Sequence, residues 1–85
     1  KWVAWQFYCP EDGEGVLQFF RHNGAPEDSL TVSLQALKPE AVYEFEDGRS
    51  GEKREMTGRE AMDGFTQFFP KQRMASVWLY REKKD

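Results

Sequence analysis

Residues 15–21 (GVLQFFR) constrain the fold of this chain most strongly. The run is short and apolar, is rich in aromatic residues, and follows the turn-forming residues Asp12-Gly13-Glu14. This pattern is typical of an interior β-strand entered from a tight turn. Residues 43–47 and 76–81 repeat the same character later in the chain. We therefore predict a small β-domain in which these three runs are strands.

The whole chain reads as short strands separated by turns. The predicted strands are residues 2–9, 15–21, 29–35, 41–47, 52–56, 65–69 and 74–81. Between strands five and six, Thr57 and Glu60 form a capping-box pattern that predicts one helical turn, ending near Gly64. Seven short strands with one helical turn favour an all-β fold, an antiparallel β-sandwich, with an open barrel as the alternative.

Individual strands carry further predictions. The first has apolar residues in both alternating sets, so we expect it to be covered on both faces. The third alternates, with Leu30, Val32 and Leu34 pointing inward. The fifth is short and polar, and its Lys53 and Arg54 indicate an edge strand.

Composition restricts the function. The chain has 85 residues, which indicates a single domain, residues 1–85. The net charge of −3 and the pI near 5.2 argue against nucleic acid as a partner. No apolar run has the roughly 20 residues that a membrane span needs. Because the chain starts with Lys1 directly before a strand pattern, we expect it to be excised from a longer chain.

Two residue pairs could suggest catalysis. Glu44 and Glu46 share one strand face, with their Cα atoms about 6.6 Å apart. This spacing could indicate a glycosidase pair, but a solvated strand face is the favoured interpretation. Cys9 and His22 could form a nucleophilic pair, but a buried structural thiol and an exposed loop histidine are favoured. One Cys and one His supply no metal site. We predict no catalytic residue, no metal and no cofactor.

Aromatic residues are the strongest functional signal, at 15% of the chain. They exceed what one inner face needs, so three interpretations of the aromatic residues remain. They could form the core, a docking surface or a sugar-stacking platform. We expect strands one and seven to lie together, which would leave some of Trp2, Trp5, Trp78 and Tyr80 on an outer face. The candidates for docking or sugar stacking are Trp5, Phe68, Trp78 and Tyr80.

Several segments, in order, resemble the C-terminal domain of glycoside hydrolase family 36 α-galactosidases. They are DGEGVLQFFR (12–21), LKPEAVYEFED (37–47), SGE (50–52), MTGREAM (56–62), GFT (64–66) and VWLYR (77–81). The resemblance implies a non-catalytic accessory β-sandwich that packs on and stabilises a (β/α)8 barrel, which hydrolyses terminal α-galactosides by a retaining mechanism. The two catalytic aspartates of that family lie on the barrel, and no position here matches them.

The resemblance implies partners as well as a fold. The partner is the barrel of the same parent chain, with a homo-oligomer of the parent as an option and a bacterial cytoplasm as the expected location. One segment departs from the family pattern, because its alternation puts Gln67 in an inward position and Phe68 in an outward position. Either a bulge shifts the register there or Phe68 is exposed for contact. The rival functions are a carbohydrate-binding module and a free-standing interaction domain.

Overall fold

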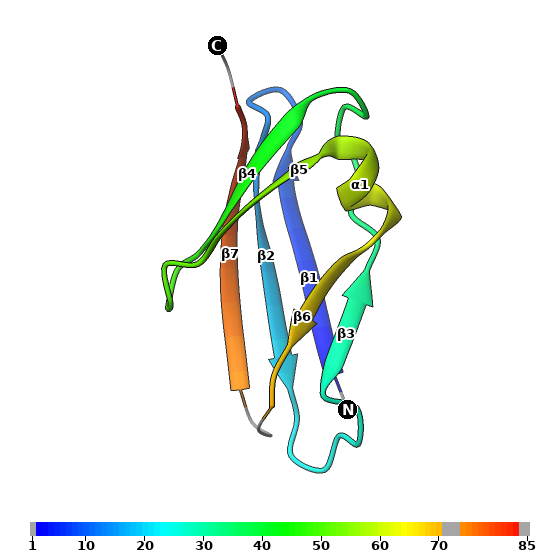
Figure 1. Ribbon diagram of the computed structural model, residues 1–85, viewed down its shortest axis with the longest axis vertical. Helices are drawn as coiled ribbons and strands as arrows, with labels where there is room; N and C mark the ends of the chain where they lie inside the picture. The colour runs from blue at the N-terminus through cyan, green and yellow to red at the C-terminus, as the bar shows by residue number, and fades with distance from the viewer. Residues whose placement is uncertain (1, 71–73, 84–85) are drawn as a thin grey trace.

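The computed structural model describes residues 2–70 and 74–83, and this part of the chain forms two antiparallel sheets (Figure 1). The larger sheet has five strands in the order β1-β2-β7-β4-β5, and the smaller sheet pairs β3 with β6. The bounds are β1 Trp2–Cys9, β2 Glu14–Arg21, β3 Ser29–Val32, β4 Val42–Asp47, β5 Lys53–Thr57, α1 Gly58–Asp63, β6 Phe65–Phe68 and β7 Met74–Glu82. The predicted all-β sandwich is confirmed, and two separate sheets fit it better than an open barrel.

The first hairpin sets the register of the larger sheet. Its turn is closed by the amide of Asp12, which donates to the carbonyl of Cys9 at 3.1 Å, and Gly13 takes the positive φ of 67° that the turn requires. β1 and β2 then pair without interruption from Cys9 opposite Glu14 to Trp2 opposite Arg21. Because β7 pairs with the other side of β2, β2 is an interior strand as predicted.

The expected contact between the first and last strands is wrong. β2 lies between β1 and β7, and β7 takes the middle of the sheet with β4 on its far side (Figure 1). A tight hairpin joins β1 to one side of β2, and β7 pairs with the other side of β2 rather than with the open side of β1. β1 and β7 run in the same direction on either side of β2, so the start of β1 and the end of β7 lie at opposite ends of the sheet (Figure 1).

The helix forms where the capping-box pattern predicts it, and a second hairpin turn precedes β5. The Asp47 carboxylate accepts from the amides of Arg49 at 2.8 Å and Ser50 at 3.4 Å, which holds the turn before β5. Both bonds of the capping box are present, since the Thr57 hydroxyl accepts from the Glu60 amide and the Glu60 carboxylate accepts from the Thr57 amide. α1 has six residues, and no helix in the described chain is long and apolar enough to cross a membrane.

Alternate residues of the larger sheet point at the smaller sheet and form the core. Phe65 of β6 lies at its centre, with its ring 4.9 Å from Phe45, 5.3 Å from Trp78 and 6.1 Å from Phe19. All four side chains are at most 1% exposed. Arg54 closes the β5 side, because its guanidinium lies over the ring of Trp78. The other core side chains are Leu17, Leu34, Leu37, Tyr43, Ala61, Phe69 and Tyr80.

Two buried polar groups are built into this core. The Gln67 side-chain oxygen accepts from the Trp78 indole at 2.7 Å and from the Ser76 hydroxyl at 2.9 Å. The Arg21 guanidinium donates to the carbonyls of Phe69 and Ala25. The bonds of Gln67 join β6 to β7. The bonds of Arg21 join the end of β2 and the loop after it to the residue that follows β6. The two sheets are therefore joined by polar as well as apolar contacts.

The strand details are confirmed in part. β3 ends at Val32, three residues earlier than predicted, yet Leu30, Val32 and Leu34 all point inward, as the alternation predicts. β5 is an edge strand, as predicted. The expectation that β1 is covered on both faces is wrong, because Trp5 and Phe7 are exposed on the side turned away from the smaller sheet.

Candidate docking surface

The outer face of the five-stranded sheet, turned away from β3 and β6, carries exposed apolar side chains. Trp5 is 51% exposed, Phe7 57% and Leu79 55%. Val77 is also exposed and Val16 is half-buried. We call these five residues, which come from β1, β2 and β7, the apolar strip. An exposed apolar group of this kind commonly marks a contact site.

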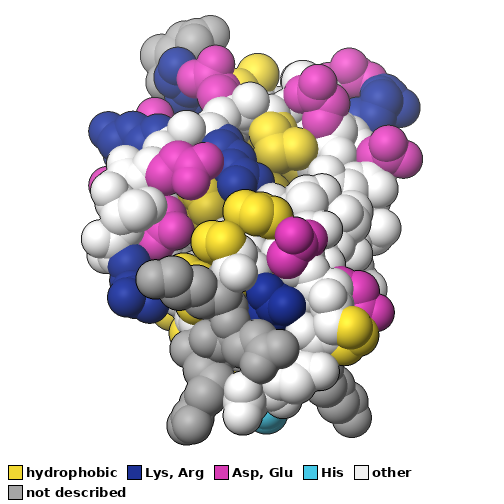
Figure 2. All heavy atoms as spheres, turned by 60° about the horizontal axis from the view of Figure 1, so that its bottom comes forward, with side chains coloured by type: hydrophobic (Ala, Val, Ile, Leu, Met, Phe, Trp, Pro, Cys, Tyr) yellow, Lys and Arg dark blue, Asp and Glu magenta, His cyan; other side chains and the backbone are white. Residues whose placement is uncertain are grey.

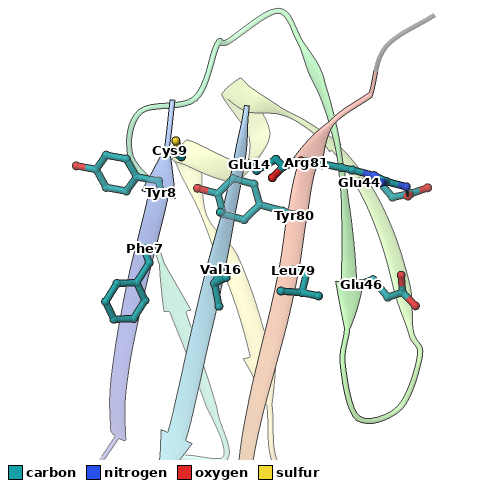
Figure 3. A pocket seen from close by; sticks show the side chains of 11 residues that line it. Phe7, Tyr8, Cys9, Glu14, Val16, Glu44, Glu46, Leu79, Tyr80 and Arg81 are labelled. Carbon is teal, nitrogen blue, oxygen red and sulfur yellow. Dashed lines mark ion pairs between the residues drawn. The ribbon is translucent and has the colours of Figure 1, made fainter. Parts of the chain in front are cut away.

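The strand register explains why residues far apart in sequence meet here. Phe7 lies opposite Val16, Val16 opposite Leu79, and Leu79 opposite Glu46. Figure 3 shows these four side chains in one row across β1, β2, β7 and β4. The next row places Trp5 and Val77 on either side of Gln18. Directly opposed residues in antiparallel strands have Cβ atoms about 5 Å apart, so the strip is continuous across three strands.

Charged residues border one end of the strip. Arg81 lies opposite both Glu14 and Glu44, and its guanidinium is 3.9 Å from the Glu44 carboxylate. This end holds an open hollow of about 560 Å³ (Figure 3). Its lining residues are Phe7, Tyr8, Cys9, Glu14, Gly15, Val16, Glu44, Glu46, Leu79, Tyr80 and Arg81. The border therefore has three carboxylates against one guanidinium, which favours a partner with basic groups around an apolar centre.

The opposite side of the molecule differs from the strip. On the face that Figure 2 shows, exposed hydrophobic side chains are broken up by acidic and basic ones. Phe68 is 54% exposed and lies on β6, where Phe65 and Gln67 point inward and Thr66 and Phe68 point outward. The two candidates Trp5 and Phe68 thus lie on opposite outer faces of the sandwich and do not form one site.

Two predicted surface candidates lie in the core instead. Trp78 is fully buried and Tyr80 is 3% exposed, so neither can contact a partner or a sugar. β7 turns Ser76, Trp78 and Tyr80 inward and Val77 and Leu79 outward. The sequence pattern did not indicate which set of β7 is buried, because the inward set includes a serine. Ser76 bonds another buried polar residue, Gln67. The aromatic excess of β7 is therefore core.

Tyr80 has a specific packing role. Its ring lies directly over Gly15, where an added Cβ would come within 2.3 Å of the ring. Its hydroxyl accepts from the Gln6 side chain at 2.8 Å, and burial raises the pKa of Tyr80. Gln6 in turn bonds both backbone groups of Gln35, so this network fixes β1 to the segment after β3. Trp2 is also partly buried, stacked 5.2 Å from Phe69.

The pairing at residues 67 and 68 shows whether a bulge shifts the register there or Phe68 is exposed. β3 and β6 pair without interruption from Val32 opposite Phe65 to Ser29 opposite Phe68. There is no bulge in this pairing, and Phe68 is exposed. Gln67 points inward because it meets the polar groups of Ser76 and Trp78 there.

The candidate catalytic pairs have no catalytic arrangement. Cys9 and His22 lie at opposite ends of the β1–β2 hairpin, roughly 26 Å apart along the strands. Cys9 is exposed, so the prediction of a buried thiol is wrong. The hydrogen bond from its thiol to the Asp12 carboxylate, 3.3 Å between sulfur and oxygen, raises the pKa of Cys9. Glu46 is exposed and Glu44 pairs with Arg81, as expected of a solvated strand face.

The described residues include no group of three or more His, Cys, Asp or Glu side chains placed to hold a metal ion. Neither the protein-family models nor the curated proteins nor the solved structures give a match to this chain.

Proposed function

We propose that this chain is a non-catalytic accessory β-sandwich domain that packs through its apolar strip on another domain of a longer polypeptide. The resemblance of its segments to family 36 α-galactosidases makes the catalytic (β/α)8 barrel of such an enzyme the proposed partner. Hydrolysis of terminal α-galactosides then belongs to the barrel, and this domain stabilises it.

The apolar strip is the observation that carries the proposal. Trp5, Phe7 and Leu79 are each more than half exposed, although they lie on a well-paired sheet with a complete core behind it. Burial of apolar surface stabilises by roughly 25 cal/mol per Å². Covering these three side chains would therefore contribute several kcal/mol to a domain contact, and leaving them in water contributes nothing to the fold.

The chemistry of the strip favours protein over sugar as the partner. Sugar platforms combine rings with polar groups that bond hydroxyls. Here Phe7 has the apolar side chain of Val16 on one side and the unpaired edge of the sheet on the other. The polar side chain beside Trp5 is that of Gln18. The carboxylates of Glu44 and Glu46 are on β4, which is separated from β1 by both β2 and β7.

The test compares the same substitution in two contexts. Leu79→Ser should leave the melting temperature of the 85-residue chain nearly unchanged, because this side chain is 55% exposed. In the full-length enzyme it should lower the melting temperature by several degrees, because the contact with the barrel is lost. Phe68→Ser, on the opposite face, is the matched control and should change neither of the two melting temperatures.

Two further measurements separate the rival functions. The isolated chain should show no turnover of an aryl α-galactoside and no binding in a galactoside titration. Binding that is weakened by Trp5→Ala or Phe7→Ala, with an unchanged melting temperature of the full-length enzyme, would instead support a carbohydrate-binding module.

A further inference from the structure

β1 forms an edge of the larger sheet that no described strand covers. Its eight residues pair on one side with β2, and its other side pairs with no strand in residues 2–70 and 74–83. The backbone N–H and C=O groups along such an edge are unused by the sheet and are free to pair with another strand. β1 is thus a long open template for strand addition.

This edge lacks the features that normally block strand addition. Between Trp2 and Cys9 the sequence has no charged residue and no proline. The other edge of the same sheet, β5, has charged side chains at Lys53, Arg54 and Glu55 in its five residues. β3 and β6 have four residues each, which limits pairing by the smaller sheet. The contrast singles out β1 as the unprotected edge.

The side chains of β1 add an apolar surface to the free backbone. Three of the six exposed large hydrophobic residues of the described chain lie on this strand, namely Trp5, Phe7 and Tyr8. The strand is also held in place, because Gln6 bonds the backbone of Gln35 and the hydroxyl of Tyr80. A preformed edge loses little conformational freedom when a second strand adds to it.

We propose that β1 pairs antiparallel with β1 of a second copy of this chain, so that two five-stranded sheets join into one. A two-fold axis perpendicular to the sheet produces this arrangement and keeps the outer faces of both copies on one side. A register centred on Trp5, for example, places Val3 opposite the partner's Phe7, and the uncharged strand opposes no like charges. The apolar strips of the two copies then become continuous.

A second copy fits this edge better than an unrelated strand. An antiparallel pair of identical strands is self-complementary, so every contact is made twice. The pairing supplies roughly one backbone hydrogen bond per opposed residue pair. It uses the edge of β1 and leaves the outer face of β7 uncovered, so it is independent of the docking proposed above and can occur together with it.

The experiment is sedimentation equilibrium of the chain from about 5 to 500 µM, a range that spans weak transient association. We expect the original sequence to form a dimer within this range. Phe7→Lys places a charge on the unprotected edge and should weaken the dimer by about tenfold or more. Leu79→Lys is the matched control, since it adds the same charge to the same outer face at the centre of the sheet, and should leave the dimer intact.

Hydrogen exchange adds a readout specific to the edge. With increasing concentration, amides of β1 should become protected while those of the second edge strand, β5, do not change. A monomer throughout the concentration range overturns the proposal. Dissociation by Leu79→Lys to the same degree as by Phe7→Lys also overturns it, because it would show that the copies meet face to face. Circular dichroism spectra matching that of the original chain confirm that each variant is folded.

Discussion

Replacement of Gln67 tests whether the buried polar cluster holds the two sheets together. Its side-chain oxygen accepts from the Trp78 indole and the Ser76 hydroxyl, at 2.7 and 2.9 Å. Gln67→Met keeps the volume nearly constant but leaves both donors buried without a partner. Each unsatisfied buried group costs about 1–3 kcal/mol, so the free energy of unfolding should fall by about 2–6 kcal/mol. A chain of this length has only about 4–13 kcal/mol in total.

Urea unfolding followed by circular dichroism measures this loss. With a slope of about 1 kcal/mol per molar urea for a small domain, a loss of 3 kcal/mol moves the midpoint down by about 3 M. Gln18→Met is the matched control, because this half-buried glutamine lies on the outer face of β2 and should change the midpoint little.

A double substitution separates the lost hydrogen bonds from the altered packing. Ser76→Ala alone removes a donor that is satisfied and should destabilise the chain. Together with Gln67→Met, the same change removes a donor that has lost its partner, so the double variant should be more stable than Gln67→Met alone. A midpoint unchanged by Gln67→Met, or a double variant whose losses simply add, would refute the reasoning.

Three other predictions concern the core, the helix and the thiol. Phe45→Ala removes a fully buried ring that contacts Phe65 and Tyr80 and should cost about 3–5 kcal/mol in urea unfolding, with a smaller loss contradicting its central place. Thr57→Ala removes the cap of α1 and should cost about 1 kcal/mol by the same assay, whereas no loss would show that the cap contributes nothing. Asp12→Asn removes the carboxylate that raises the pKa of Cys9, so iodoacetamide should label the thiol faster near pH 8, and a slower rate would contradict the assigned cause.

Local features of this fold could be predicted from the sequence because they depend on neighbouring residues. The alternation on β4 separates Glu44 and Glu46 on one face from Tyr43 and Phe45 on the other, and both aromatic residues are buried. The capping box of Thr57 and Glu60 forms as predicted, and the turn after Asp47 is held by the Asp47 side chain itself. Each of these depends on side chains within a few residues of one another, where spacing alone determines the geometry.

The order of strands and the assignment of faces could not be predicted in the same way. Both alternating sets of β7 contain large apolar residues, so hydrophobicity alone does not tell which set is buried. The choice is made by partners distant in sequence. Gly15 leaves room for the ring of Tyr80, and Gln67 accepts from the indole of Trp78. Trp5, one of the surface candidates, is exposed, whereas Phe7 and Leu79 become visible as one surface only after the strands are paired.

The most direct measurement of the docking proposal is covalent footprinting of side chains with a photoactivated carbene, on the 85-residue chain and on the longer parent enzyme that the proposal assumes. In the isolated chain Trp5, Phe7 and Leu79 should all be labelled, because each is more than half exposed. In the parent enzyme their labelling should fall strongly, while Phe68, on the opposite face, should be labelled equally in both. Equal labelling of the three strip residues in the two proteins would contradict the proposal that this face is a domain contact.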